Sequence, residues 1–122
     1  MTSSAPSPEY YGVSRVTGRN FRSTVTVTRP ADTTAYAAGD VIGTSTSAIQ
    51  TLSGIGPTGG FVLLQSLSLA FSDASVPAGM AGFRVHFYHG SPGAVVDNAA
   101  FDLTAADQAT YSGFVDLPSP SD

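Results

Sequence analysis

The stretch FVLLQSLSLAF, residues 61–71, is the longest β-like run in the chain. Its odd-numbered side chains are large and apolar except at Gln65, and small residues fill the even positions from 66 to 70. Because successive side chains of a strand point to opposite faces, the far half of this run predicts a strand with one apolar face and one small, polar face. The glycine-rich sequence SGIGPTGG at residues 53–60 predicts a loop before it.

Further strands are predicted on both sides of this run. The sequence RSTVTVT at 22–28 alternates β-branched residues and is followed by Arg29-Pro30, where proline cannot donate to a β-ladder. In FRVHFYH at 83–89, Phe83, Val85 and Phe87 share an inward face, and the outward face carries Arg84, His86 and Tyr88. Shorter strands are predicted from Val41 and over 99–103 and 111–117, with a turn at 77–79 and a turn or one helical turn at 104–110.

These five or six strands, with no amphipathic helix beside them, predict an all-β fold: antiparallel sheets in a β-sandwich or jelly-roll-like arrangement. Alternation places four aromatic side chains in its core, namely Phe61, Phe71, Phe83 and Phe87. So few strands leave open sheet edges, so we expect a partner subunit or missing C-terminal strands to complete the sheets. This domain spans 21–117, between a flexible N-terminal arm at 1–20 and a polar tail at 118–122.

The composition favours a protein whose surface is partly an interface. The chain has 122 residues, enough for one domain with a modest core. Only 11% of its residues are charged, against about 25% in a typical soluble domain. Covering hydroxyls and backbone groups in a contact costs far less than covering unpaired charges. We therefore expect assembly, and not catalysis, to be the work of this chain.

The charges are divided unevenly along the chain. Four of the five arginines precede residue 30 and only Glu9 opposes them, so this part carries +3. The rest has one arginine against eight aspartates, or −7, and the two parts give the net charge of −4. Two roles are open for these arginines: docking of the arm on an acidic surface, or ordinary pairing with carboxylates. Binding of nucleic acid is not expected, because the arginines are spread along an acidic chain and do not form a basic patch.

Interface residues are predicted where arginine and tyrosine stand outside the expected core. Tyrosine combines apolar area with a hydroxyl group and is enriched at interfaces, as is arginine. For Tyr88 on its outward face, an interface role and plain surface exposure are both open. The predicted interface residues are Tyr10, Tyr11, Arg15, Arg19, Arg22 and Tyr88.

Patterns for catalysis, metals and cofactors are missing from the sequence. There is no cysteine and no G-x-S-x-G elbow, and the loop at 56–60 lacks the G-K-[ST] of a phosphate loop. His86 and His89 fall on opposite faces of one strand, which separates them as metal ligands. Four side chains could offer oxygen ligands to Ca²⁺, namely Asp97, Asn98, Asp102 and Asp107. They lack the spacing of a calcium-binding loop, so we expect them to cap loops and turns. We expect no enzyme activity, no cofactor and no bound metal.

Two segments resemble a known group of proteins. TVTRPADTTAYAAGDVIG at 24–43 and VPAGMAGFRVHFYHGSPGAVVDNAAFDL at 76–103 are similar to small bacteriophage virion structural proteins, including head-decoration proteins. The resemblance covers residues 21–117, and it implies a jelly-roll-like fold, a place on the phage particle and multimeric contacts. In the first segment, Tyr36 is expected to anchor the loop, as part of a scaffold and not of an active site.

The expected function is that of a capsid decoration or cement subunit that binds the head lattice in many copies. Its partners would be the major capsid protein or other virion proteins, and further copies of itself, with a trimer as one arrangement. We expect no nucleic-acid or membrane partner, synthesis in the host cytoplasm and a final place in the virion. The alternative is a tail or head-fibre module that recognises a host glycan, although tryptophan, a common glycan platform, is absent.

Overall fold

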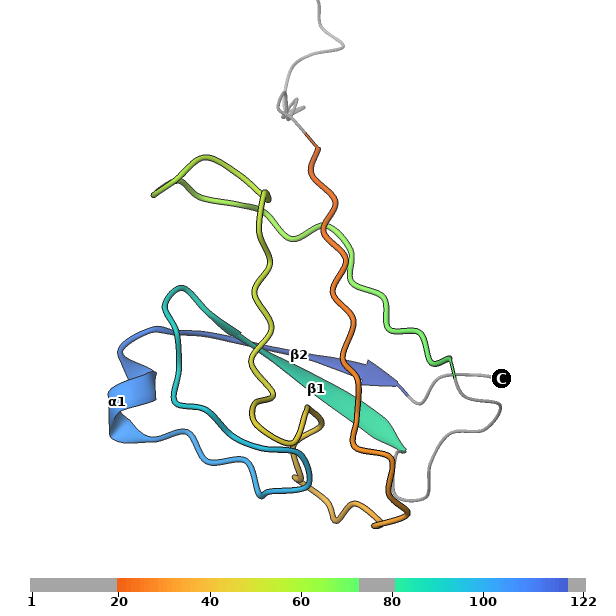
Figure 1. Cartoon of the computed structure of the whole chain (residues 1–122). Helices are drawn as coiled ribbons and strands as arrows, with labels where there is room; N and C mark the ends of the chain where they lie inside the picture. Colours follow the sequence, from red (N-terminus) through yellow and green to blue (C-terminus); the bar gives the residue numbers. More distant parts are fainter. Residues whose placement is uncertain (1–19, 73–80, 119–122) are drawn as a thin grey trace, which may run out of the picture.

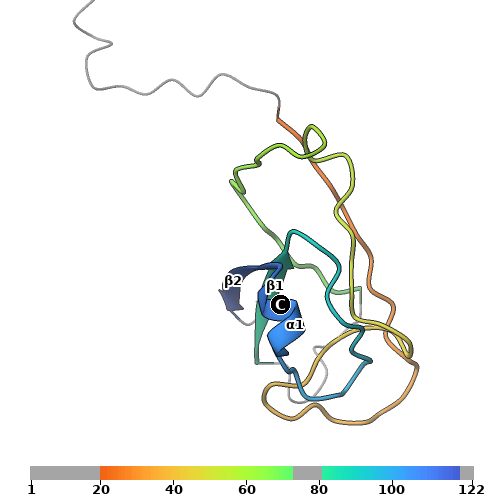
Figure 2. The same cartoon turned by 90° about the vertical axis from the view of Figure 1, so that its left-hand side faces the viewer.

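The computed structural model describes residues 20–72 and 81–118. Its regular elements are strand β1 (Gly82–Tyr88), helix α1 (Ala105–Gln108) and strand β2 (Tyr111–Pro118). The two strands form an antiparallel ribbon, and extended chain and loops pass around it (Figures 1 and 2). The chain is therefore β-rich with a small antiparallel sheet. The turn predicted at 77–79 lies outside the described residues.

The β1–β2 ribbon forms because two strands with alternating residues pair in antiparallel register. Arg84 lies opposite Asp116, and His86 lies opposite Phe114. The pairing shifts between Phe87 and Tyr88, where β2 carries one extra residue. Gly113 beside this bulge has φ +116°, a conformation that glycine adopts without the clash of a side chain. The strands predicted at 83–89 and 111–117 are confirmed.

Helix α1 is a single turn that leads into β2. The Thr104 hydroxyl accepts a hydrogen bond from the Asp107 amide at 3.2 Å, which satisfies one of the free donors at the helix start. The Gln108 amide donates to the Thr104 carbonyl at 3.1 Å. Of the two structures predicted for 104–110, the helical turn is the one that forms.

The segments 22–28 and 61–71 do not form the strands predicted for them. Both run as extended chain (Figure 1), yet neither makes a backbone hydrogen bond to any other described residue. In both views the 22–28 segment lies beside the chain near residue 50, again without a backbone hydrogen bond (Figures 1 and 2). β-branched residues favour extended backbone, but a strand also needs a neighbour that shares its ladder. Within the described chain these segments lack one.

The core is correspondingly small. Among the described residues Tyr36, 8% exposed, is the only buried hydrophobic side chain. The prediction that Phe61 belongs to the core is wrong, because its side chain is fully exposed. Phe71 and Phe83 are half-buried, with ring centroids 5.2 Å apart. The described residues therefore leave much apolar surface in contact with solvent.

The face of β1 predicted to point outward is partly covered. His86 and Tyr88 are half-buried, and only Arg84 of the three is exposed. The Phe101 ring stacks on the His86 ring, with centroids 3.9 Å apart, and the Tyr88 ring lies 5.2 Å from that of Tyr111. Because these aromatic contacts cover part of the face that was predicted to point outward, the simple division into inward and outward faces fails.

Candidate functional site

The segments 24–43 and 76–103 contact each other through a polar cluster. The Tyr36 hydroxyl donates to the Asp97 carboxylate, 2.7 and 2.9 Å from its two oxygens. The buried Gly43 amide donates to Asp97 Oδ1 at 2.9 Å. We call Arg29, Tyr36, Gly43 and Asp97 the clasp. Its partners come from positions up to 61 residues apart in sequence.

Arg29 closes the clasp from the side of the N-terminal segment. Its guanidinium donates to the Tyr36 hydroxyl, and its Cζ lies 4.6 Å from the centroid of the Tyr36 ring. Burial and the hydrogen bond to Asp97 both raise the pKa of Tyr36. The hydroxyl therefore keeps its proton at neutral pH and remains a donor to the carboxylate.

Backbone pairing reinforces the clasp. The Val41 amide donates to the Ala99 carbonyl at 2.8 Å, and the Asn98 amide donates to the Val41 carbonyl at 2.8 Å. An isolated antiparallel bridge joins Asp40 to Ala100. Asn98 turns the chain with φ +61°, a left-handed conformation that asparagine tolerates better than most residues. These contacts confirm that Tyr36 anchors its loop, and they make the motif a scaffold.

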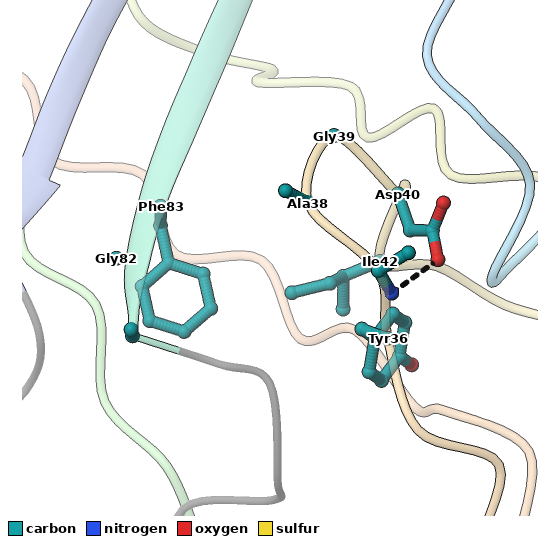
Figure 3. A pocket seen from close by; sticks show the side chains of 9 residues that line it. Tyr36, Ala38, Gly39, Asp40, Ile42, Gly82 and Phe83 are labelled. Carbon is teal, nitrogen blue, oxygen red and sulfur yellow. Dashed lines mark hydrogen bonds between the residues drawn. The ribbon is translucent and has the colours of Figure 1, made fainter.

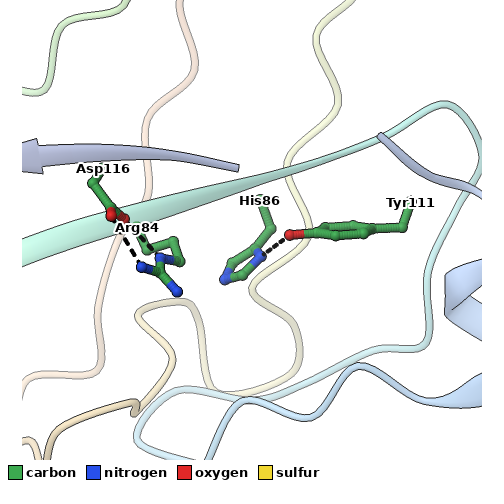
Figure 4. A network of polar contacts seen from close by, with 4 residues as sticks. All are labelled: Arg84, His86, Tyr111 and Asp116. Atoms are coloured by element: carbon green, nitrogen blue, oxygen red, sulfur yellow. Dashed lines mark hydrogen bonds and ion pairs between the residues drawn. The ribbon is translucent and has the colours of Figure 1, made fainter. Parts of the chain in front are cut away.

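A second polar cluster lies on the β1–β2 ribbon (Figure 4). Arg84 forms two hydrogen bonds to the Asp116 carboxylate, at 2.6 and 2.9 Å. His86 Nδ1 lies 3.0 Å from the Tyr111 hydroxyl. The hydrogen bonds from Arg84 lower the pKa of Asp116, whereas burial lowers the pKa of His86. Both side chains of the ion pair are more than half exposed, so the pair itself adds little stability.

A shallow hollow of about 270 Å³ opens beside the clasp, between the loop at 36–42 and the start of β1. Phe83 faces Ile42 and Tyr36 across it, and the Ala37 amide donates to Asp40 at its rim (Figure 3). Apart from that carboxylate, the lining offers alanine, glycine and apolar side chains. The hollow has room for an apolar side chain but lacks the convergent polar groups of a substrate site.

Exposed apolar side chains are concentrated, within the described residues, on the segment with the longest β-like run. We call residues 61–69 the apolar edge. Five large side chains on it are strongly exposed: Phe61 (101%), Leu63 (75%), Val62 (56%), Leu64 (50%) and Leu69 (45%). Contiguous apolar surface of this kind on a soluble protein usually marks a contact with another molecule.

Sequence reasoning assigned this stretch to a core and so missed it as a contact surface. One signal could have identified it. Residues 61–64 are apolar at odd and even positions alike, which is the pattern of a strand buried on both faces. A domain with one small core cannot cover both faces of such a strand from its own chain.

The predicted interface residues are not brought together in the described structure. Arg22 is exposed on the extended segment before the clasp. Tyr88 is half-buried, its ring centroid 5.2 Å from that of Tyr111, and burial raises its pKa. Four of the predicted residues lie outside the described residues, namely Tyr10, Tyr11, Arg15 and Arg19.

Several of the residues considered for metal binding have hydrogen-bond or stacking partners in the structure. His89 Nδ1 lies 3.2 Å from the Ser112 hydroxyl, while His86 is engaged by Tyr111 and Phe101. Asp107 accepts hydrogen bonds from the Gly93 amide and the Thr104 hydroxyl, and the first of these lowers its pKa most. In residues 20–72 and 81–118, no three His, Asp or Glu side chains converge in a way that could hold a metal ion.

Comparison of the chain with protein-family models, with curated proteins and with solved structures gives no match. Across the part of the chain that the structure describes, no helix has the length and apolar character to cross a bilayer. The candidate functional surface thus rests on geometry: a scaffold held by the clasp, with the apolar edge and the 22–28 segment exposed beside it.

Proposed function

We propose that this chain is a non-enzymatic structural subunit of a bacteriophage particle, a decoration or cement protein that binds the head lattice in many copies. The observation that carries the proposal is the exposed apolar edge, together with a second extended segment at 22–28 that lacks a backbone partner among the described residues. Both supply what strand addition by another chain requires: free main-chain groups and alternating side chains.

In structural terms, strands of neighbouring subunits would complete the sheets of this chain. The β1–β2 ribbon supplies one small sheet, and 22–28 and 61–71 supply two further strands once neighbouring chains pair with them. The completed subunit would be a β-sandwich of jelly-roll-like form, as the resemblance of residues 24–43 and 76–103 to phage structural proteins implies. The clasp would hold the edges in place for their partners.

The surface chemistry supports assembly over catalysis. Charged residues make up 11% of the chain, so few charges lose their water when its surface is covered. The 22–28 segment also exposes apolar side chains, namely Val25 (41%) and Val27 (38%). Many copies on one lattice would turn modest single contacts into tight attachment, and binding only to the assembled state would stabilise that state.

The copy number of the chain on purified phage particles tests this proposal. We expect quantitative mass spectrometry, calibrated against the major capsid protein of the same particles, to find hundreds of copies per virion. About a dozen copies would place the chain at a vertex, connector or tail and would contradict the decoration role. Its absence from washed particles would contradict the structural role altogether.

A further inference from the structure

We propose that two copies of this chain pair with each other through their apolar edges, antiparallel and about a two-fold axis that passes between the two Gln65 residues. The inference rests on the proposed assembly role and names a second copy as the first partner of the edge. It starts from the segment 61–69, in which every residue but the half-buried Leu67 is exposed, and from its lack of backbone hydrogen bonds to other described residues.

The pattern of the edge selects this register. In antiparallel pairing about Gln65, Phe61 lies opposite Leu69, and Leu63 lies opposite Leu67, so apolar side chains meet on the odd-numbered face. A shift by one residue would set this apolar face against the small polar one. A shift by two would place the Gln65 amide opposite a leucine, where it would lose water without gaining a hydrogen-bond partner.

Gln65 is the residue that makes the edge complementary to itself. A glutamine amide has a carbonyl acceptor and an NH₂ donor, so two facing amides can hydrogen-bond to each other across a two-fold axis. Such an isologous contact closes after two copies. The only polar interruption on the odd-numbered face of 61–69 then finds its partner in its own equivalent.

The charge distribution permits this contact. Residues 61–71 contain no charged residue, so no like charges meet when two edges align. They also contain neither lysine nor proline, the residues with which proteins commonly block an edge strand. Elsewhere each chain carries a net charge of −4, so two copies repel unless an uncharged surface joins them. Added salt should therefore strengthen the pairing, because it screens that repulsion.

The exposed apolar area supplies part of the affinity of such a dimer. With about 200 Å² for a fully exposed phenylalanine, the exposed fractions of the five large side chains amount to on the order of 500 Å² per edge. Two edges together expose roughly 1,000 Å², close to the smallest area of a specific protein–protein interface. Side-by-side pairing covers only part of this area, because Val62 and Leu64 face away from the odd-numbered side chains, so main-chain hydrogen bonds of the shared ladder supply the rest of the affinity.

Charge reversal at the axis tests the proposal. The full chain should sediment as a dimer that dissociates on dilution, and Gln65→Glu or Gln65→Lys alone should weaken the dimer about tenfold or more, because like charges then face each other. An equimolar mixture of the two variants should restore the dimer, since opposite charges face each other in the mixed pair. Gln108→Glu and Gln108→Lys, the same changes on the exposed helix α1, should leave the dimer unchanged.

A cysteine at the axis gives a second test that does not depend on the strength of the dimer. The chain has no cysteine, so Gln65→Cys can form a disulfide-linked dimer only with its own equivalent. Mild oxidation should link it rapidly, and Gln108→Cys should link at least tenfold more slowly.

Three results would overturn the proposal: a monomer at all concentrations, heterogeneous aggregates without a discrete dimer, or a mixture of the charged variants that fails to recover the dimer. A monomer in solution that is still present in hundreds of copies on particles would refute the second copy as partner and leave the decoration role standing. A stable dimer that is absent from particles would support the second copy as partner and refute the decoration role.

Discussion

Asp97 joins the segment 76–103, to which it belongs, to the segment 24–43. Its carboxylate accepts hydrogen bonds from the Tyr36 hydroxyl and the buried Gly43 amide. The role expected for Asp97 from the sequence was loop capping, and the Gly43 contact fits that role. The partner 61 residues away could not be predicted, because local pattern carries no information about which distant donors a carboxylate will meet. Tyr36 was predictable as an anchor because a single large aromatic stands in a loop of small residues.

Replacement of Asp97 should destabilise the chain more than any exposed aspartate would. Asp97→Ala leaves the Gly43 amide and the Tyr36 hydroxyl without their acceptor, and each unsatisfied group costs about 1–3 kcal/mol in the free energy of unfolding. The matched change Asp102→Ala, at an exposed position, should stay within about 0.5 kcal/mol. Urea unfolding followed by circular dichroism measures both. Equal stability of the two variants would show that the clasp does not hold the fold.

The β1–β2 ribbon shows which elements sequence patterns can predict. Both strands were predicted within a residue or two, because each alternates over most of its length and each has the other as its ladder partner. The stretches 22–28 and 61–71 alternate equally well, but they form no ladder with described residues. Alternation predicts a preference for extended backbone, whereas pairing depends on a neighbour in hydrogen-bonding register, which neither stretch has among the described residues. The stacking of Phe101 on His86 was missed for the same reason.

Packing of the 91–104 segment on the ribbon should make stability depend on pH through His86. Burial holds the His86 pKa below its ordinary 6.5, and nearby Arg84 lowers it further, while Asp116 acts in the opposite direction. The unfolded chain therefore binds this proton more readily than the folded chain. Stability should be full above pH 6.5 and fall as the pH drops from 6.5 towards the lowered pKa.

The thermal unfolding midpoint at pH 7.5 and pH 5 measures this effect. We expect a lower midpoint at pH 5 for the natural chain. His86→Phe keeps an aromatic ring against Phe101 and removes the titrating group, so its midpoint should change less between the two pH values. His89→Phe, a change at the exposed histidine nearby, should retain the full pH dependence. If His86→Phe kept the full dependence as well, another group would be responsible.

At the scale of the whole molecule, a hydrogen-bonded centre stands beside extended segments with exposed apolar side chains. The clasp and the ribbon fix the centre of the chain, but only one hydrophobic side chain among the described residues is buried. The few charges and the small number of predicted strands already indicated that the chain would have a small core and an exposed apolar surface. The exposure of 61–64 had a signal in its apolar residues at odd and even positions, whereas the exposure of 22–28 had none, because it depends on which other segments pair with it.

Hydrogen–deuterium exchange of residues 22–28 and 61–69 tests most directly whether these segments find their ladder partners in other chains. The amides should exchange rapidly in the dilute free chain and become strongly protected in purified particles, while the β1–β2 ribbon stays protected in both. Protection of both segments in the dilute monomer, or rapid exchange of both in the particle, would contradict the account.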